Sequence, residues 1–191
     1  MTAPWQRPST GASAALAARF ASLVPTIDTA RLRLRAPGIE DFPIYARFMF
    51  DEPGASAGKA DLDEAAWLDF CQLVAGWNLR GFGSWTVESR ADGTPVGAIV
   101  INHEHGDPEV EIGWVLTPEG EGQGYATEAA SRALDYAFGP MGFATLVSYI
   151  DHANEGSMAV ARRLGARRDP KAEAEMEHAC FVFRHTREAR A

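Results

Sequence analysis

Apolar and polar residues alternate along several short stretches of the chain, and each such stretch predicts a half-buried strand. The first of them is 30–36, which reads ARLRLRA. A tight hairpin turn, ADGTP at 91–95, separates two further stretches of this kind. The pattern predicts strands at 30–36, 84–89, 96–102, 109–116, 145–150 and 179–185.

Other segments repeat their apolar residues every three or four positions, as an amphipathic helix does. Pro43 fits the first turn of one such segment, and in another Asn154 suits the N-cap and Gly165 the C-terminal stop. Helices are predicted at 39–50, 61–80, 124–138 and 154–165. No repeat or low-complexity linker divides these elements, so they predict one α+β, or mixed α/β, domain.

The centre of the chain reads as strand, helix and strand at 109–116, 124–138 and 144–150. A connection of this length favours a parallel strand pair joined by a right-handed crossover. On the solvent side of the helix, Glu128 and Arg132 are spaced as an ion pair. The side that faces the sheet is apolar and consists of Ala126, Ala130, Ala133, Leu134, Ala137 and Phe138.

Residues 1–27 are expected to form an N-terminal arm, and residues 28–191 the domain. The segment GASAALAARFASLV has helical spacing, but Arg19 interrupts it and no basic stretch precedes it, which argues against a signal peptide. Two readings of the arm stay open. It is either frayed or loosely docked on the domain, or it is a helix that packs on a partner subunit.

Composition narrows the class of protein. The chain has 191 residues, and its formal net charge of -8 argues against a nucleic-acid-binding protein. The longest apolar runs are too short to cross a membrane. Cys71 and Cys180, the two cysteines, lie in apolar stretches and are expected to be buried thiols in a reducing compartment, which favours a cytoplasmic protein. An acidic protein is also compatible with a cationic or amine-bearing partner.

Three glycines, Gly120, Gly122 and Gly124, crowd the junction between the central strand and helix. The first N–H groups of a helix lack intrahelical acceptors, and glycines let a phosphate approach them. The alternative is a merely flexible glycine turn. A P-loop is excluded because Tyr125 and Ala126 follow the last glycine, and a dinucleotide-binding fingerprint would occur at the first strand of the chain.

The segment EGQGYA at 121–126 resembles the acyl-CoA-binding motif Gln/Arg-x-x-Gly-x-Gly/Ala of the GCN5-related N-acetyltransferases, the GNATs. Glu121 stands where the family has Gln or Arg. The preceding EIGWVL resembles the family's fourth strand, and NEGSMAVARRLGA further on resembles its Asn-x-x-Ser-x(6)-Leu-Gly segment. The combination is similar to the branch that includes the ribosomal-protein alanine acetyltransferases RimJ and RimL.

This resemblance implies a mostly antiparallel sheet with a splayed parallel pair, and a strand–helix–strand unit that binds acetyl-CoA. It also implies a possible homodimer and a loop that acts mainly through backbone N–H groups, with Glu121 pointing outward. The residues that it assigns to acetyl-CoA are Val115, Leu116, Glu121, Gly122, Gln123, Gly124, Tyr125, Ala126, Thr127, Asn154 and Arg162.

Acetyl transfer to an amine requires a base, because an ammonium group has no lone pair. Family members often use a glutamate at the position of Glu111, through a water. Burial between Val110 and Ile112 would raise the pKa of that carboxyl, although a solvated strand glutamate is the alternative. Gly113 in the same strand predicts a bulge or a close backbone approach.

The leaving thiolate calls for an acid. Ala161 stands where many relatives have a tyrosine, and Ser157 is the nearest substitute. The alternative for Ser157 is a serine that only caps its helix. Arg162 and Arg163 are either near the adenosine phosphate or solvated.

The sequence contains no recognisable metal site: His103 and His105 are two candidate ligands in NHEHG but lack a third partner at a metal-binding spacing. Trp85 and Trp114 are expected in the core or beside the acceptor pocket. Two functions remain open. One is an N-acetyltransferase that moves acetyl from acetyl-CoA to a primary amine by direct attack; the other is a non-catalytic acyl-CoA-binding regulatory module. The acceptor itself has no recognisable code.

Overall fold

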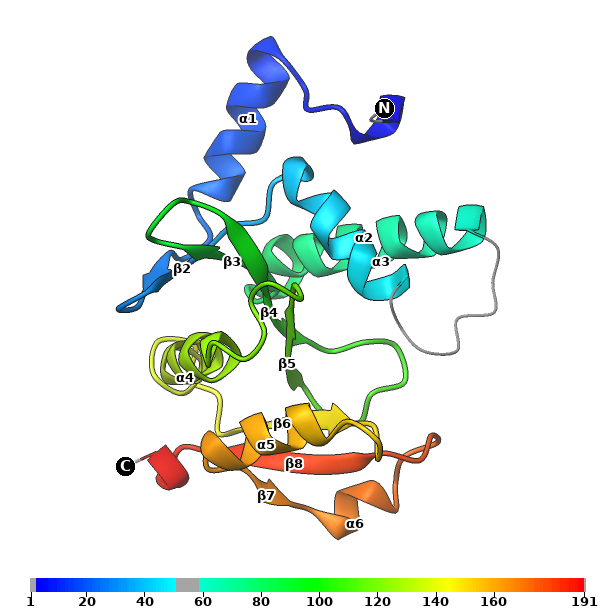
Figure 1. Cartoon of the computed structure of the whole chain (residues 1–191), viewed down its shortest axis with the longest axis vertical. Helices are drawn as coiled ribbons and strands as arrows, with labels where there is room; N and C mark the ends of the chain where they lie inside the picture. The colour runs from blue at the N-terminus through cyan, green and yellow to red at the C-terminus, as the bar shows by residue number, and fades with distance from the viewer. Residues whose placement is uncertain (1–2, 51–58, 191) are drawn as a thin grey trace.

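The computed structural model describes residues 3–50 and 59–190 (Figure 1). Its helices are η1 (Pro4–Gln6), α1 (Gly11–Ala21), η2 (Ile39–Asp41), α2 (Phe42–Phe50), α3 (Lys59–Arg80), α4 (Tyr125–Phe138), α5 (Glu155–Arg163), α6 (Pro170–Glu173) and η3 (Glu188–Arg190), where η marks a 3-10 helix. Its strands are β1 (Ile27–Asp28), β2 (Leu32–Arg35), β3 (Ser84–Ser89), β4 (Pro95–Asn102), β5 (Glu111–Leu116), β6 (Thr145–Ile150), β7 (Arg167–Arg168) and β8 (Phe181–Thr186).

Within the described residues the strands form one sheet, in the order β1-β2-β3-β4-β5-β6-β8-β7. Neighbouring strands are antiparallel except β5 and β6, which are parallel and pair only at Glu111 and Val147. Beyond that point the Ser148 hydroxyl donates to the Ile112 carbonyl oxygen at 2.6 Å. Figure 1 shows β5 running steeply away from β6. The predicted splayed parallel pair and crossover helix are therefore confirmed.

α4 covers one face of the sheet and builds the main core. Its buried face, which includes Leu134, packs with Trp85 of β3 and Ile112 of β5. The predicted ion pair between Glu128 and Arg132 is wrong. Glu128 instead binds Arg31, at 2.6 Å, and Arg132 binds Asp135. The hairpin turn between β1 and β2 reaches the first turn of α4, and this tertiary contact replaces the local pair.

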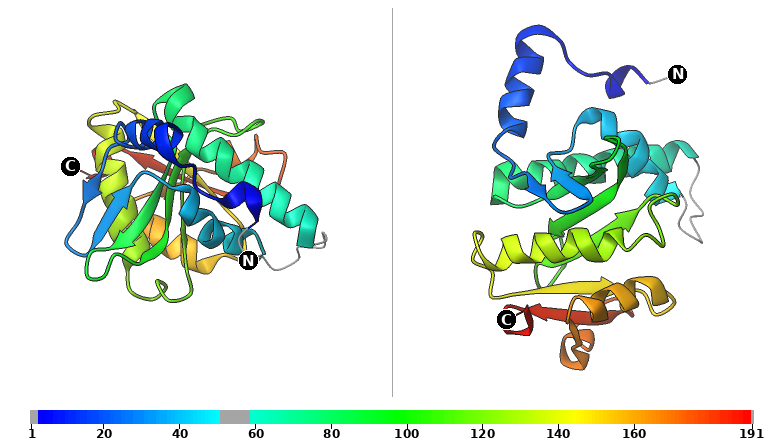
Figure 2. Two further views of the ribbon diagram at one scale, coloured as in Figure 1. Left: turned by 90° about the horizontal axis from the view of Figure 1, so that it is seen from above. Right: turned by 60° about the vertical axis from the view of Figure 1, so that its left-hand side comes forward.

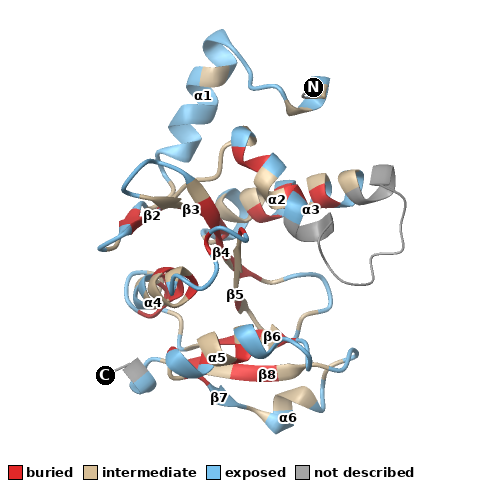
Figure 3. Ribbon diagram, in the orientation of Figure 1, coloured by how far each residue is buried: buried red, intermediate tan, exposed pale blue. Residues whose placement is uncertain are grey.

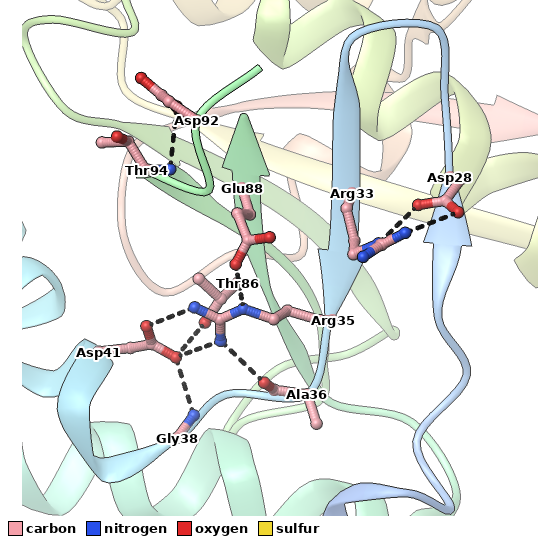
Figure 4. A network of polar contacts seen from close by, with 10 residues as sticks. All are labelled: Asp28, Arg33, Arg35, Ala36, Gly38, Asp41, Thr86, Glu88, Asp92 and Thr94. Atoms are coloured by element: carbon pink, nitrogen blue, oxygen red, sulfur yellow. Dashed lines mark hydrogen bonds and ion pairs between the residues drawn. The ribbon is translucent and has the colours of Figure 1, made fainter. Parts of the chain in front are cut away.

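α2 and α3 cover the opposite face and pack on each other through a smaller cluster (Figure 1). α2 is fixed to the sheet by Asp41, a buried carboxylate that accepts hydrogen bonds from Arg35 of β2, the Gly38 backbone N–H and the Thr86 hydroxyl of β3 (Figure 4). Arg35 also donates to Glu88 of β3 at 2.7 Å and to the Ala36 carbonyl oxygen at 3.2 Å. Polar contacts therefore add to the apolar packing of Phe42 where η2 leads into α2.

The predicted strands and helices are found with boundaries shifted by a few residues. β1, β7 and α6 were missed because they are too short to show a period. The predicted bulge at Gly113 is wrong: β4 and β5 pair in continuous register through it, and the register shift in this region lies in β3 at Val87/Glu88. A Cβ on Gly113 would meet no atom within 4 Å, so no close backbone approach is found there either.

Both cysteines are free, but the prediction of buried thiols is wrong. Cys71 is exposed and Cys180 is partly exposed. α3 turns Phe70 and Leu73 inward, and the helical period places Cys71 on the opposite side. Among the described residues, no helix combines the length and apolar character that crossing a bilayer requires.

The N-terminal segment stands apart from the domain (Figure 2). α1 has no buried residue, and its Leu16 and Phe20 are more than half exposed (Figure 3). Trp5 is the anchor before it, in edge-to-face contact with Phe42 and Trp67. These contacts agree with a loosely docked arm; the partner-subunit reading and the domain boundary at residue 28 stay predictions.

Candidate active site

The glycine loop precedes α4 and exposes its main chain. Gly122 and Gly124 have φ values of +69° and +76°, in the left-handed region that favours glycine. Gly120 has a different role, because a Cβ there would lie 2.9 Å from the Val96 carbonyl oxygen. The glycines thus shape the loop in two ways: two set the turn, and one permits close packing on β4.

Within the described chain, the backbone N–H groups of residues 122–127 donate no hydrogen bond to a protein acceptor. The N–H of Glu121 is occupied by the Thr117 carbonyl oxygen at 3.2 Å, and its side chain is exposed. Orphan donors at the positive end of a 14-residue helix suit a phosphate group. Tyr125, Ala126 and Thr127 form the first turn of that helix. Of the loop residues predicted to bind acetyl-CoA, those from Gly122 to Thr127 therefore lie together.

The splay between β5 and β6 exposes a second set of backbone groups. Val110 and Ile112 direct their carbonyl groups toward β6. With the two-residue period of a strand, Trp114 and Leu116 do the same, whereas Val115 is directed toward β4. An extended amide-bearing chain could pair with Trp114 and Leu116. The backbone contact predicted for Val115 is therefore not supported, and Trp114 was missed.

Glu111 lies at the point where the parallel pairing ends, on the sheet face that also carries Asn102 and Gly113. Burial, followed by the charges of Asp107 and Glu104, raises the pKa of Glu111 to about 8. The Tyr149 backbone N–H acts in the opposite direction. A carboxyl group with such a pKa exchanges protons near neutral pH, as a general base must.

Further acidic groups surround Glu111 on this face. Asp69 of α3 accepts a hydrogen bond from the Tyr45 hydroxyl of α2 at 2.9 Å. Burial raises the pKa of Asp69, and burial together with the Asp69 and Asp107 charges raises the pKa of Glu104. The loop from β4 to β5, strand β5 and helix α3 thus bring four carboxyl groups near one another.

At the start of α5, Asn154 caps the helix as predicted: its Oδ1 accepts from the Ser157 N–H at 2.9 Å. The Ser157 hydroxyl makes no hydrogen bond to any described residue, so it does not cap the helix. Gly165, with φ +84°, follows the last turn as predicted. Arg162 is exposed and its guanidinium lies 5.7 Å from the Phe183 ring centroid.

Comparison with known proteins decides the family. The sequence pattern of the family described as "Acetyltransferase (GNAT) domain" matches residues 31–167. The chain belongs to the GNAT acetyltransferases. It is therefore an N-acetyltransferase of a family that uses acetyl-CoA.

Individual relatives agree with this assignment. The crystal structure of an acetyltransferase from Agrobacterium tumefaciens is 36% identical, with a TM-score of 0.77 over 86% of this chain and 95% of that one. A Mycobacterium smegmatis RimJ structure in complex with CoA-disulfide shares the fold, at 21% identity and TM-score 0.63 over 82% of each chain. A spermidine N(1)-acetyltransferase from Escherichia coli is 34% identical over 87 residues, 46% of this chain and 44% of that enzyme.

Several residues near Glu111 were not predicted from the sequence. Tyr45 and Asp69 lie far from the motif along the chain and reach the face of Glu111 only through the packing of α2 and α3. Glu104 and Asp107 lie in NHEHGDPEVE, whose run of acidic residues was a visible signal. His103 lies there too, and its Nε2 is 3.0 Å from the Asp107 carbonyl oxygen. The described residues include no group of three or more His, Cys, Asp or Glu arranged to share a metal ion.

Proposed function

We propose that this GNAT transfers an acetyl group from acetyl-CoA to a primary amine by direct attack in a ternary complex, with Glu111 as the general base. The observation that carries the proposal is the position and pKa of Glu111. It is the residue of β5 that pairs with β6, beside the splay, and its pKa of about 8 lets it take up a proton near neutral pH.

The backbone groups described above fit the co-substrate in two places. The free N–H groups of 122–127 would hold the diphosphate, and the backbone of Trp114 and Leu116 would pair with the pantetheine arm. When bound, acetyl-CoA supplies an activated thioester carbonyl. The chain supplies binding, orientation and proton transfer around it.

Glu111 accepts a proton from the acceptor ammonium, directly or through water, and this leaves a neutral amine. As the amine nitrogen bonds to the acetyl carbon, the carbon–sulfur bond breaks and the sulfur leaves as a thiolate. The nitrogen gives up its second proton to water to become the neutral amide, and the thiolate takes up a proton from water. The Ser157 hydroxyl, which has no hydrogen-bond partner among the described residues, would donate a hydrogen bond to that sulfur. A catalytically silent module would have no use for a carboxyl group held at this pKa and place.

The acceptor is proposed to carry positive charge besides the amine that reacts. Asp69, Glu104 and Asp107 lie around the base. Burial raises the pKa of Asp69, and burial together with the charges of Asp69 and Asp107 raises the pKa of Glu104, so negative charges at this site repel one another. A second cationic group on the acceptor would relieve this repulsion. The similarity to a spermidine acetyltransferase over 87 residues supports the same class of acceptor.

Two amines of equal length test the proposal. Thiol release from acetyl-CoA would be followed with 1,5-diaminopentane and with pentylamine, which lacks the second ammonium group. We expect kcat/KM for the diamine to exceed that for pentylamine by at least about tenfold, with the advantage falling as salt is added. Equal values would contradict the cationic acceptor. Coenzyme binding without thiol release, with these amines and with peptide N-termini, would contradict the proposed reaction.

A further inference from the structure

Arg31 contacts the glycine loop from outside the strand–helix–strand unit. Its Nη1 donates to the Gln123 carbonyl oxygen at 2.9 Å, and its guanidinium lies 4.7 Å from the Tyr125 ring centroid. The two contacted residues, Gln123 and Tyr125, lie on either side of Gly124. A residue 92 positions earlier in the sequence thus holds the loop where its backbone turns into α4.

The guanidinium is itself held in one orientation. Its Nε and Nη2 bind Oε2 of Glu128, at 2.7 and 2.6 Å. The other carboxylate oxygen accepts hydrogen bonds from the Thr29 hydroxyl and the Arg31 backbone N–H. Glu128 is mostly buried by these contacts, at 19% exposure of its side chain. The β1–β2 turn and the first turn of α4 are therefore joined by a hydrogen-bonded network centred on Glu128.

This arrangement sets the direction of one peptide group. In a trans peptide the C=O and the following N–H point in opposite directions. Because Arg31 binds the Gln123 carbonyl oxygen, the Gly124 N–H points away from Arg31 and has no acceptor in the part of the chain that the structure describes. Gly124 has no Cβ and a left-handed φ, so without this contact its peptide group has unusually free rotation.

We infer that Arg31 is a positioning residue for coenzyme binding: it fixes the 123–124 peptide so that the Gly124 N–H is already oriented for the diphosphate. The inference rests on the proposed use of the loop. The guanidinium charge is compensated by Glu128, so orientation, rather than attraction of phosphate to a free cation, is the main effect.

The test compares Arg31→Ala with Arg33→Ala. Arg33 lies two residues further along and makes an exposed ion pair with Asp28, away from the loop. Calorimetric titration would measure binding of CoA, of 3′-phosphoadenosine 5′-diphosphate, which is its diphosphate half, and of pantetheine. We expect Arg31→Ala to weaken CoA and the diphosphate half about tenfold, to leave pantetheine within about twofold, and Arg33→Ala to change none of them.

Arg31→Lys separates orientation from charge, because lysine keeps the charge but lacks the planar fork that binds Gln123 and Glu128 together. We expect its CoA affinity to stay within about threefold of Arg31→Ala. Full recovery with lysine would show that charge suffices and overturn the inference, as would an equal loss of pantetheine. If Arg31→Ala does not fold, Arg31→Lys and Arg31→Gln provide the same comparison.

Binding by the wild-type protein separates a failure of the proposed use of the loop from a failure of the proposed role of Arg31. Wild-type protein that binds neither CoA nor its diphosphate half would overturn the proposed use of the loop. Wild-type protein that binds both, with Arg31→Ala binding them equally well, would overturn only the role of Arg31.

Discussion

Glu111 acquires its chemistry from where the strand places it. A glutamate in solution would be a weak base at neutral pH. Here burial and the neighbouring carboxylates Asp107 and Glu104 oppose its negative charge, and its pKa rises to about 8. The same neighbours that make the site attractive to a cation therefore make Glu111 a stronger base.

The pH dependence of activity should report this group. Glu111 must be deprotonated to accept a proton, so kcat/KM for a given amine should rise as the pH increases through about 8. Asp107→Asn removes a neighbouring charge and should shift this rise to lower pH. Because the amine ionises identically in both enzymes, the difference between the two profiles isolates Glu111. Glu111→Gln should lower kcat by about 10²–10⁴-fold and leave CoA affinity unchanged. An unmoved profile in Asp107→Asn would contradict the assignment.

The sign of the linked stability effect is opposite to that of activity. A carboxyl group whose folded pKa is raised contributes stability fully below its unfolded pKa, and loses it as the pH rises through about 8. The melting temperature of Glu111→Gln minus that of the wild type should therefore be larger at pH 9 than at pH 6.

At the same scale, the sequence predicted the chemistry of individual residues better than their directions. Glu111, Asn154 and the glycines could be read from type and spacing. The backbone direction of Val115 could not, because it depends on which strand edge pairs with β4. Tyr45, Asp69 and Arg31 reach the site only through tertiary contacts, which no local pattern encodes.

Among the elements, α2 follows a residue that a buried network of polar contacts fixes to the sheet, Asp41. Burial alone would raise the pKa of Asp41, but the Arg35 guanidinium, the Gly38 N–H and the Thr86 hydroxyl outweigh it and hold the pKa below its usual range. Tyr45, one turn further along α2, reaches Asp69 at 2.9 Å. The Asp41 network thus sets the position of a helix that contributes to the acceptor side of the site.

Asp41→Asn keeps the shape of the side chain and removes its charge, which leaves Arg35 without its main partner. We expect the free energy of unfolding at pH 7 to fall by about 2–3 kcal/mol. The effect should shrink as the pH falls through the lowered Asp41 pKa, because the wild-type carboxylate then becomes neutral too. Asp28→Asn, which breaks the exposed pair with Arg33, is the control and should cost less than about 0.5 kcal/mol. Chemical denaturation of both variants would measure this difference, and equal losses would argue against a special role for Asp41.

The longer helices and strands could be predicted from the sequence, because an element of six or more residues shows the repeat of its apolar positions. The pairing of Glu128 with Arg31, instead of Arg132, shows where a local rule fails. A helix-surface pair contributes only about 0.3–0.5 kcal/mol, so a tertiary partner displaces it easily.

For the whole molecule, the open question is the arm. α1 buries none of its residues, whereas Trp5 packs against Phe42 and Trp67 of the α2–α3 layer. The arm therefore contacts the domain at both ends: at Trp5, and at Pro25, whose carbonyl oxygen accepts a hydrogen bond from Trp85 Nε1. The exposed helix α1 lies between these two contacts.

Leu16→Gln with Phe20→Gln should leave the melting temperature unchanged, since both side chains are already more than half exposed. Trp5→Ala should lower the unfolding free energy by about 1 kcal/mol, because it removes two aromatic contacts. Sedimentation of the double variant tests the alternative reading. A wild-type dimer that the double variant converts to monomer would show that α1 packs on a second subunit.

The hydroxyl of Ser148, bonded to the Ile112 carbonyl oxygen, ends the parallel ladder after a single rung. The two lobes that meet there, β1–β5 with α4 and β6–β8 with α5, share few main-chain links across that seam. A co-substrate that extends along β5 would supply the missing rungs. Its arrival would tie the lobes together, so that the halves of the sheet would lose their structure as one cooperative unit.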